Sequence, residues 1–578
     1  MQQRRRFPGA EPSSLPWRRA SRKKIQEIST QKDKIDFELV ELLKSCAQKK
    51  DVCNGIRLHS EVLQRGLLQK SPHIASSLIN MYAKCGLLVR ARNVLEDLHA
   101  RDVFSWSALI AGYAQHGHGH EALRCFSRMK IEGLSPNVVT FISILKGCGS
   151  IGDLKNGEEI CREIIIGGLL AKDVMVGTAL VDMYAKCGML TKARIVLEQL
   201  PVRNIVSWNA LIAGYSHHDQ DHEALMCLEL MQREGLSMNE VTFTCILKAC
   251  GNTQDLEKGK QIHNEIIRKG LFKNIVLSNA LVFMYAKCGM LVKARVVLED
   301  LPHRNVISWS TIIAGYAQDG QGHEALLCFE QMRREGLSPN DITFICILKA
   351  IGATGAIQKG KEIHDEIVDR GLLKNNIYLG NALVDMYAKC GALTKAKNVF
   401  EELQARNIVS WNALIAGYAQ NGRESEALSC FSRALKEGLS PNEVTFLCVL
   451  NACNHSRKLD EAQTFYDNMN KEYGIIPMLE HHTCMVVMLG YFGNFDKAIS
   501  IIKTMPFSKD PSVWLALLAT CRKWENVKVA KLVFNEAIKL DCDFTQAYVL
   551  LSGIYAAVGM HEDAKKVKAL RVMSKRPG

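Results

Sequence analysis

Histidine and cysteine are the side chains of this sequence that could bind a metal ion, and both recur along the chain. Histidines form two clusters, at His116, His118 and His120 and at His217, His218 and His222. A zinc site would need carboxylate or thiolate ligands at regular spacing beside them, and none occur nearby. In a later repeat the slot of His120 holds Ser425, which suits a helix cap or a solvated turn. We therefore expect no metal and no cofactor.

The 20 cysteines follow the periodicity of the chain. Four equivalent slots hold Cys46, Cys148, Cys250 and Cys453, and a further one holds Ile351. A slot that accepts isoleucine is an apolar packing position. A second set recurs at Cys85, Cys187, Cys288 and Cys390, and no Cys-x-x-Cys pair occurs. We interpret the cysteines as buried, reduced thiols in a reducing compartment.

Motifs of catalytic chemistry are absent from the sequence. It has no Gly-x-Ser-x-Gly, no glycine-rich phosphate loop, and no His-x-Glu followed by Cys-x-x-Cys. We therefore expect a protein that is not an enzyme, and we look for function in binding.

A period of 101 to 102 residues dominates the chain. It is marked by Trp106, Trp208, Trp309 and Trp411, and by the string MYAKCG from Met81, Met183, Met284 and Met386. In residues 408–442, apolar residues from Trp411 to Tyr418 form one helical stripe, Asn421-Gly422 interrupts the chain, and a second stripe follows up to Gly438. Such a helical hairpin cannot bury its own apolar face. The repeat therefore predicts an all-α solenoid, a superhelix of stacked hairpins with a concave surface.

Each long period contains three units of about 35, 36 and 31 residues. The predicted units span 36–71, 72–102, 103–137, 138–173, 174–204, 205–239, 240–274, 275–305, 306–340, 341–376, 377–407, 408–442, 443–478 and 479–510. We expect one array over residues 36–510, and a different but related helical pattern over residues 511–578.

Charge and composition separate a leader from the repeat body. Residues 1–35 hold ten Lys or Arg and three acids, so they carry +7 of the net charge of +13. This Arg- and Ser-rich, acid-poor segment is typical of an organellar transit peptide, and a disordered basic tail fits equally well. No run approaches the roughly 18 apolar residues of a membrane span, so we expect no membrane association.

The strings VSWNALIAGY from Val206, VTFISILKGCG from Val139 and NALVDMYAKCG from Asn381 resemble the P, L and S motifs of plant pentatricopeptide repeat proteins of the PLS subclass. The resemblance covers about residues 36–578. It implies binding of single-stranded RNA in a mitochondrion or chloroplast, one base per repeat, through the fifth and the last residue of a unit. The mostly apolar second residues, such as Val206, Val276, Ile307 and Val409, would then wedge between stacked bases.

The candidate base-reading pairs come from the eight units of the P and S types. They are Ser76 and Asp102, Ser107 and Asn137, Thr178 and Asn204, Asn209 and Asn239, Asn279 and Asn305, Ser310 and Asn340, Asn381 and Asn407, and Asn412 and Asn442. The family's code makes Ser with Asp favour G, Ser or Thr with Asn favour A, and Asn with Asn favour pyrimidines. The long units carry Val40, Ile142, Ile345 and Leu447 at the fifth position, which cannot hydrogen-bond a base, and Thr244 with Asn274 favours A weakly. The implied target is 5′-n-G-A-n-A-Y-n-Y-A-n-Y-Y-n-3′.

The last residues of the units and the recurrent lysines each have a structural explanation as well. Asn is common where a chain turns into a helix, so the last residues could serve turn geometry alone. The fifth residues favour base reading, because they are expected inside the first helix, off its apolar stripe, and alternate between Ser or Thr and Asn. Recurrent lysines, Lys84, Lys186, Lys287 and Lys389, fit either phosphate contacts or a solvated helix face.

The carboxyl end resembles the terminal motifs of editing-type members of the family. Units 443–478 and 479–510 look like closing L and S motifs, with Thr483 and Asp510 in the reading positions, and residues 511–578 look like paired E motifs. The sequence ends where a DYW-type cytidine deaminase domain would begin. We expect a recognition factor for C-to-U editing with the deaminase supplied in trans, or a sequence that is truncated before the deaminase domain. An organellar RNA processing, splicing or stability factor and a protein-binding scaffold are the alternatives.

Overall fold

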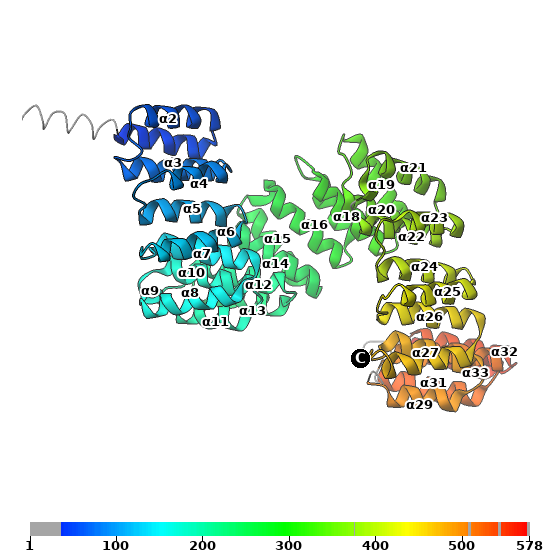
Figure 1. The fold of residues 1–578 in the computed structure, drawn as a ribbon. Coiled ribbons are helices and arrows are strands. Elements are labelled where there is room, and N and C mark those ends of the chain that lie inside the picture. The colour runs from blue at the N-terminus through cyan, green and yellow to red at the C-terminus, as the bar shows by residue number, and fades with distance from the viewer. Residues whose placement is uncertain (1–35, 375, 507–509, 542–544, 575–578) are drawn as a thin grey trace, which may run out of the picture. The chain divides into compact units, whose positions relative to one another are not determined.

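The computed structural model describes residues 36–374, 376–506, 510–541 and 545–574, so the expected leader, residues 1–35, lies outside it. Every regular element in these ranges is a helix (Figure 1), which confirms the all-α prediction. The chain divides into two compact units, Met1–Met284 and Tyr285–Gly578. None of the described helices has the length and apolar character needed to cross a bilayer.

The first compact unit is a series of helical hairpins. A helix over residues 36–49 opens it, and each later first helix starts at the first residue of a repeat range given above. The first helices are α3 (Pro72–Lys84), α5 (Val103–Gln115), α7 (Val138–Ile151), α10 (Val174–Lys186), α12 (Ile205–His217) and α14 (Glu240–Thr253). The second helices are α2 (Val52–Gln64), α4 (Leu88–Glu96), α6 (Gly119–Ile131), α8 (Leu154–Ile166), α11 (Leu190–Gln199), α13 (Asp221–Arg233) and α15 (Leu256–Arg268). Short helices α9 (Leu169–Lys172) and η1 (Leu271–Lys273) follow α8 and α15.

The second compact unit continues the pattern, and the division falls within α16 (Ile275–Lys287). Its first helices are α18 (Val306–Gln318), α20 (Asp341–Thr354), α22 (Ile377–Lys389), α24 (Ile408–Gln420), α26 (Glu443–Ser456), α28 (Leu479–Tyr491), α30 (Pro511–Cys521) and α32 (Thr545–Ala557). Its second helices are α17 (Leu291–Glu299), α19 (Gly322–Arg334), α21 (Ile357–Asp369), α23 (Leu393–Glu402), α25 (Glu424–Lys436), α27 (Leu459–Lys471), α29 (Phe495–Thr504), α31 (Val527–Leu540) and α33 (His561–Ser574). Short helices η2 (Leu372–Lys374) and η3 (Arg522–Trp524) complete it.

The three unit lengths have a structural cause. The second helices α4 and α11 of the shortest units have 9 and 10 residues, whereas α6 and α13 have 13. The difference is about one helical turn. The long units instead have first helices of 14 residues, such as α7, and three of them, 138–173, 240–274 and 341–376, add a short helix after the second one. Unit length is therefore set by the second helix and by the connection that follows it.

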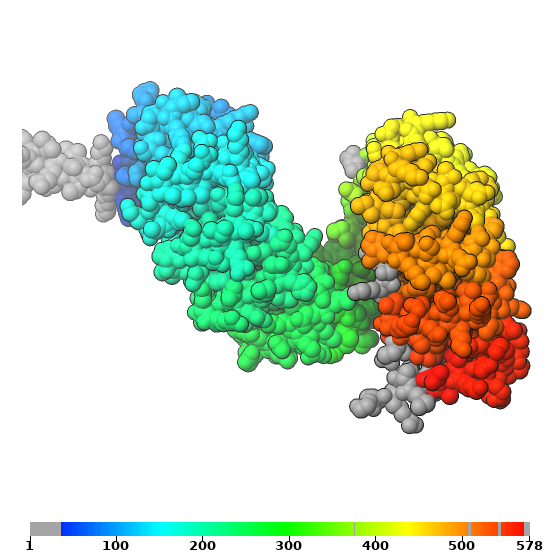
Figure 2. Space-filling model, turned by 90° about the horizontal axis from the view of Figure 1, so that it is seen from below, coloured from blue at the N-terminus to red at the C-terminus, as the bar shows by residue number. Residues whose placement is uncertain are grey.

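Within each compact unit the hairpins stack in chain order, as the colour progression in Figure 2 shows. Successive first helices contact one another: α5 packs on α3 and α7 in the first unit, and α24 packs on α22 and α26 in the second. A second helix such as α25 contacts its own first helix and the next one. The stack is thus two helical layers thick, and burial of each apolar stripe depends on the neighbouring hairpins.

The apolar stripe expected in residues 408–442 is the core of its hairpin. Trp411 and Ile415 of α24 are fully buried, and Ala427 of α25 is buried against them in the same hairpin. After α25 the chain turns at Gly438, whose φ of 77° lies in the left-handed region that glycine adopts without strain. The expected C-terminal stop is therefore confirmed.

Helices α30 to α33 extend the same architecture. Val486 and Leu489 of α28 share one apolar core with Trp514 and Leu517 of α30 and with residues of α31 to α33. The carboxyl-terminal helices are therefore a continuation of the stack, and their core is shared with the last repeat.

Candidate nucleic-acid interface

The fifth residues of the repeats lie within the first helices, and six of the eight candidate reading residues are buried, which we did not expect, while Ser76 and Asn279 are half-buried. Asn412 is 5% exposed and Ser107 is 4% exposed, close to the values of the apolar stripe. The first helix of the next hairpin covers this position. Sequence spacing alone placed these side chains off the stripe, because it describes one hairpin and ignores the neighbour that packs on it.

The last residue of each regular unit is the N-cap of the next first helix. Asn442 accepts a hydrogen bond from the backbone N–H of Thr445, and the Thr445 hydroxyl accepts one from the backbone N–H of Asn442. The same capping box occurs at Asp102, Asn137, Asn204, Asn239, Asn305, Asn340 and Asn407. The turn explanation of these residues therefore has a clear structural basis, and it leaves open a second role for the same side chains.

In four pairs a hydrogen bond joins the two candidate reading residues. Nδ2 of the fifth residue donates to Oδ1 of the last residue in Asn209–Asn239 at 2.9 Å and in Asn412–Asn442 at 3.1 Å. Asn381–Asn407 has the same contact at 3.5 Å, and the Ser107 hydroxyl lies 3.4 Å from Oδ1 of Asn137. The two residues named by the sequence thus converge across a hairpin boundary, 26 or 30 positions apart in the chain.

The remaining pairs are not joined directly. Ser310 contacts the Thr343 hydroxyl at 2.6 Å, and that hydroxyl donates to Asn340 at 2.8 Å. Ser76 donates to the carbonyl of His73, while Asp102 caps α5, and no bond joins the two. Thr178 is buried and has no bond to Asn204. The pair Asn279 and Asn305 is divided between the two compact units.

Buried polar atoms without a hydrogen-bond partner recur at the fifth position. They are Oγ1 of Thr178 and Oδ1 of Asn279, Asn381 and Asn412. Such atoms are uncommon in folded proteins, and each costs about 1–3 kcal/mol when it stays unpaired. Their repetition at one structural position makes the fifth position a candidate site for a ligand that offers hydrogen-bond donors.

In each compact unit most of the second residues of the first helices are exposed apolar side chains in regular order, and we call them the exposed apolar row. The four expected wedge residues are 50% to 60% exposed, and the row also contains residues that we had not singled out. Its members are Phe104, Val139, Met175, Val206, Val241, Val276, Ile307, Ile342, Tyr378, Val409 and Val444. Exposed apolar side chains in regular order mark a binding surface. Flat or branched side chains spaced one per repeat suit the faces of stacked bases.

Hydroxyls at the third position of the following unit were missed by the sequence reading. Thr140, Thr242 and Thr343 are fully buried, and each contacts the fifth residue of the preceding unit. The sequence signal is the Asn-x-x-Thr capping pattern, of which we had considered only the Asn.

The recurrent lysines are ion-paired where an acid lies one turn earlier. Lys186 contacts Asp182 and Lys389 contacts Asp385, both at 2.7 Å, on exposed helix faces.

The fifth residues of the long units differ from those of the other units. Apolar ones, such as Ile142 and Ile345, are half-buried, and the Thr244 hydroxyl donates to the Glu240 carbonyl of its own helix. The fifth residues of the long units therefore offer a base few hydrogen bonds.

A hollow of about 460 Å³ opens beside one predicted reading residue. Ser76 lines it together with Val40, Ser71 and His73 of the first two hairpins.

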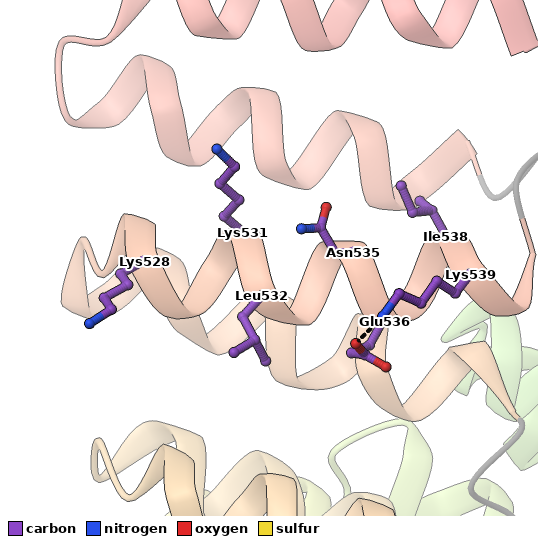
Figure 3. Close-up of a pocket in the computed structure, with 7 residues that line it drawn as sticks. All are labelled: Lys528, Lys531, Leu532, Asn535, Glu536, Ile538 and Lys539. Carbon is purple, nitrogen blue, oxygen red and sulfur yellow. Dashed lines mark hydrogen bonds and ion pairs between the residues drawn. The ribbon is translucent and has the colours of Figure 1, made fainter.

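A second hollow lies along α31, and Figure 3 shows its residues. It contains Lys528, Lys531 and Lys539, and Glu536 pairs with Lys539 at 2.7 Å. Its seven lining residues include no buried polar atom without a partner, so we assign it no ligand.

The histidine clusters are exposed and lie on the turns between two helices and on the helix ends beside these turns. His116 contacts the Gly112 carbonyl at 3.0 Å, and His218 contacts the Ala185 carbonyl at 3.1 Å.

In the described part of the chain, the atoms that could together hold a metal ion are those of Glu424, Cys453 and Glu461. Lys458 already lies 3.1 Å from both carboxylates, so its ammonium takes the place of a cation.

Burial explains the character of the recurrent cysteines. Cys148 and Cys453 are fully buried, as is Ile351 in the equivalent slot. Burial raises the pKa of Cys148 and of Cys453 to about 12, so both stay protonated thiols at neutral pH. The second set differs from our expectation, because Cys187 and Cys390 are only half-buried at the ends of α10 and α22.

The fold defines a helical-repeat protein whose first helices carry polar pairs and exposed apolar side chains in regular order. The family models described as "PPR repeat family" and "PPR repeat" match this chain. The first matches residues 101–150, 203–252, 304–353 and 406–455. The second matches residues 74–103, 178–205, 241–271, 276–306, 381–408 and 444–473.

Two plant proteins are similar in sequence over most of the chain. "Pentatricopeptide repeat-containing protein At2g03380, mitochondrial" from Arabidopsis thaliana is 32% identical over 93% of this chain and 77% of its own length. "Pentatricopeptide repeat-containing protein At1g15510, chloroplastic" from the same plant is 32% identical over 92% of this chain and 60% of its own length. The chain therefore belongs to the pentatricopeptide repeat family.

A solved structure is similar in fold. The pentatricopeptide repeat protein PPR10, solved in complex with an 18-nt psaJ RNA element, has 17% sequence identity and a TM-score of 0.54. The likeness covers 93% of this chain and 84% of PPR10. It confirms the predicted α-solenoid.

Proposed function

We propose that this protein binds single-stranded RNA in a sequence-specific manner and acts in organellar RNA metabolism. One observation carries the proposal. In four repeats a fifth and a last polar residue are in contact, unpartnered buried oxygens recur at Thr178, Asn381 and Asn412, and exposed apolar side chains lie on the same first helices. Hydrogen-bond readers flanked by stacking surfaces are what recognition of unpaired bases requires.

Family membership supports the class of ligand and the compartment. PPR10, which shares the fold, was solved with an RNA element, and relatives are named mitochondrial or chloroplastic. We accordingly propose a mitochondrial or chloroplast location. The base-reading residues are the eight pairs given above, and the proposed target is 5′-n-G-A-n-A-Y-n-Y-A-n-Y-Y-n-3′.

The finer assignment is a PLS-subclass member with E-type motifs that recognises sites for C-to-U editing. Support comes from the three unit lengths, which match distinct second helices, and from residues 511–574, which extend the stack with hairpins of their own. In this proposal the array selects the RNA and a DYW-type deaminase acts in trans. The edited cytidine lies four nucleotides 3′ of the base that faces residues 479–510.

Selection from a random single-stranded RNA pool by the purified full chain tests RNA binding. Enrichment of the proposed register supports sequence-specific reading, and the absence of any enriched motif favours a protein-binding scaffold. A variant lacking residues 511–578 then separates two functions. Loss of editing with unchanged RNA affinity supports the editing role, whereas unchanged function in the organelle supports processing, splicing or protection of the transcript.

A further inference from the structure

Among the Asn–Asn pairs, the amide of Asn209 has a partner that the others lack. Thr242, fully buried at the third position of α14, donates its hydroxyl to Oδ1 of Asn209 at 2.7 Å and lies 3.0 Å from Oδ1 of Asn239. Nδ2 of Asn209 donates to Oδ1 of Asn239 at 2.9 Å. The carbonyl and one N–H of Asn209 are therefore both used within the protein, and one N–H remains for a ligand.

The pairs of the second compact unit differ at the carbonyl oxygen. Nδ2 of Asn412 donates to Asn442, but Oδ1 of Asn412 is buried without a partner. Thr445, which corresponds to Thr242, donates its hydroxyl to Asn442 at 2.9 Å and does not bond Asn412. Asn381 has the same arrangement, with an unpartnered Oδ1, and Ser410 bonds only to Asn407.

This difference has a chemical consequence for reading pyrimidines. Ring atom N3 of cytosine accepts a hydrogen bond, whereas N3–H of uracil donates one. An amide with one free N–H suits cytosine. An amide whose carbonyl oxygen has no partner can also accept a hydrogen bond from N3–H of uracil. The side chain must rotate to expose this oxygen, and the rotation breaks no hydrogen bond to the oxygen. The same rotation at Asn209 would break the 2.7 Å bond from Thr242.

We propose that Thr242 is a specificity-determining residue that makes the Asn209–Asn239 pair favour C over U, while the Asn412–Asn442 and Asn381–Asn407 pairs accept both. Thr242 acts through Asn209 and does not itself contact the base. The inference rests on the proposed RNA-binding function and refines it, because the three pairs carry identical reading residues and differ in the hydroxyl behind them.

The test measures affinity of the full chain for synthetic 13-nucleotide RNAs of the proposed register. They differ by C or U at the sixth position, which faces residues 205–239, or at the twelfth, which faces residues 408–442. One net hydrogen bond corresponds to roughly a five- to tenfold preference. We expect C to be favoured by about that factor at the sixth position, and C and U to agree within about twofold at the twelfth.

Three variants separate specificity from helix capping. Thr242→Val should reduce the preference at the sixth position to within about twofold, and Thr242→Ser, which keeps the hydroxyl, should retain it. Thr445→Val loses the equivalent cap contacts and should change neither preference. A C preference that survives in Thr242→Val, or that is lost in Thr445→Val, overturns the inference. Absence of RNA binding, or equal binding of purines at the sixth position, instead overturns the proposed function.

Discussion

The indole N–H of Trp309 donates to a carboxylate oxygen of Glu335 at 2.8 Å, across the two helices of one hairpin. Arg304, just before that hairpin, pairs with the same carboxylate at 2.8 Å. The arrangement recurs once per long period at Trp106 with Glu132, Trp208 with Glu234 and Trp411 with Glu437. The tryptophans that reveal the period in the sequence therefore bind the carboxylate through which an arginine of the preceding unit pairs with the hairpin. This connection fixes the turn in which the last reading residue, here Asn305, lies.

The first prediction concerns this carboxylate. Burial raises the pKa of Glu335, but hydrogen bonds from Arg304 and Trp309 outweigh burial, and the net pKa lies below its ordinary value of 4.5. Because the folded-state pKa is lowered, the stabilisation is present above about pH 4.5 and decreases as the pH falls through the folded-state value. We expect Glu335→Gln to destabilise the protein by about 1–2 kcal/mol at neutral pH.

Thermal unfolding of wild type and Glu335→Gln across a pH series checks this prediction. The difference between the two should be constant near neutrality and should shrink in acid. A difference that grows toward low pH would contradict the role assigned to the ionised carboxylate.

The second prediction concerns the exposed apolar row. Phe104 and Tyr378 are 62% and 70% exposed on first helices, so replacing them with Ser removes little buried surface. Stacking on an aromatic side chain contributes about 1–3 kcal/mol per base. We expect each change to weaken RNA binding about tenfold and to leave the melting temperature unchanged. Ile131→Ser is the matched control, because Ile131 is 84% exposed on the second helix α6 and should not affect RNA affinity.

The third prediction concerns the close packing of first helices. A Cβ atom added at Gly417 of α24 would overlap the Cβ of Ala388 of α22. Gly417→Ala should therefore force the helices apart and destabilise the second compact unit by about 1–3 kcal/mol. Gly553 of α32 is the control, because an added Cβ there meets no atom within 4 Å. Gly553→Ala should be neutral or stabilising, by up to about 1 kcal/mol. Equal effects of the two changes in hydrogen exchange would exclude the packing argument.

Much of the fold was predictable because the same helix and turn patterns recur in every repeat. The stripe from Trp411 to Ile415 and the stop at Gly438 each recur, so local periodicity was enough to place helices and turns. The family likewise followed from short strings such as the one beginning at Val206.

What the sequence could not supply is the contact between neighbouring hairpins. Burial of Asn412 depends on the helix that packs over it, and the bond from Thr242 to Asn209 joins residues 33 positions apart. Thr445 has the same residue type and the same cap, yet it makes no such bond. Whether the threonine hydroxyl bonds the fifth residue depends on small shifts between stacked helices. Residue type and spacing do not reveal these shifts for a single repeat.

The last prediction tests whether the fifth residue reads a base. Ser310 and Asn412 occupy equivalent positions, and the hydroxyls behind them, Thr343 and Thr445, cap the helix alike, at 2.8 Å and 2.9 Å from the last Asn. Asn412→Ser therefore turns one site into a copy of the other. We expect the preferred base at the twelfth position of the target to change from a pyrimidine to A, by about tenfold in relative affinity.

Competition between RNAs that differ only at this position measures the change, and Asn412→Ala is the matched control. The alanine variant should lose the preference without acquiring a new one, since it removes the amide and offers no hydroxyl. Both variants keep Asn442 and its cap on α26, so helix capping is the same in each. If Asn412→Ser retains the pyrimidine preference, the fifth residue does not read the base. The contact between Asn412 and Asn442 would then serve only the packing of the turn.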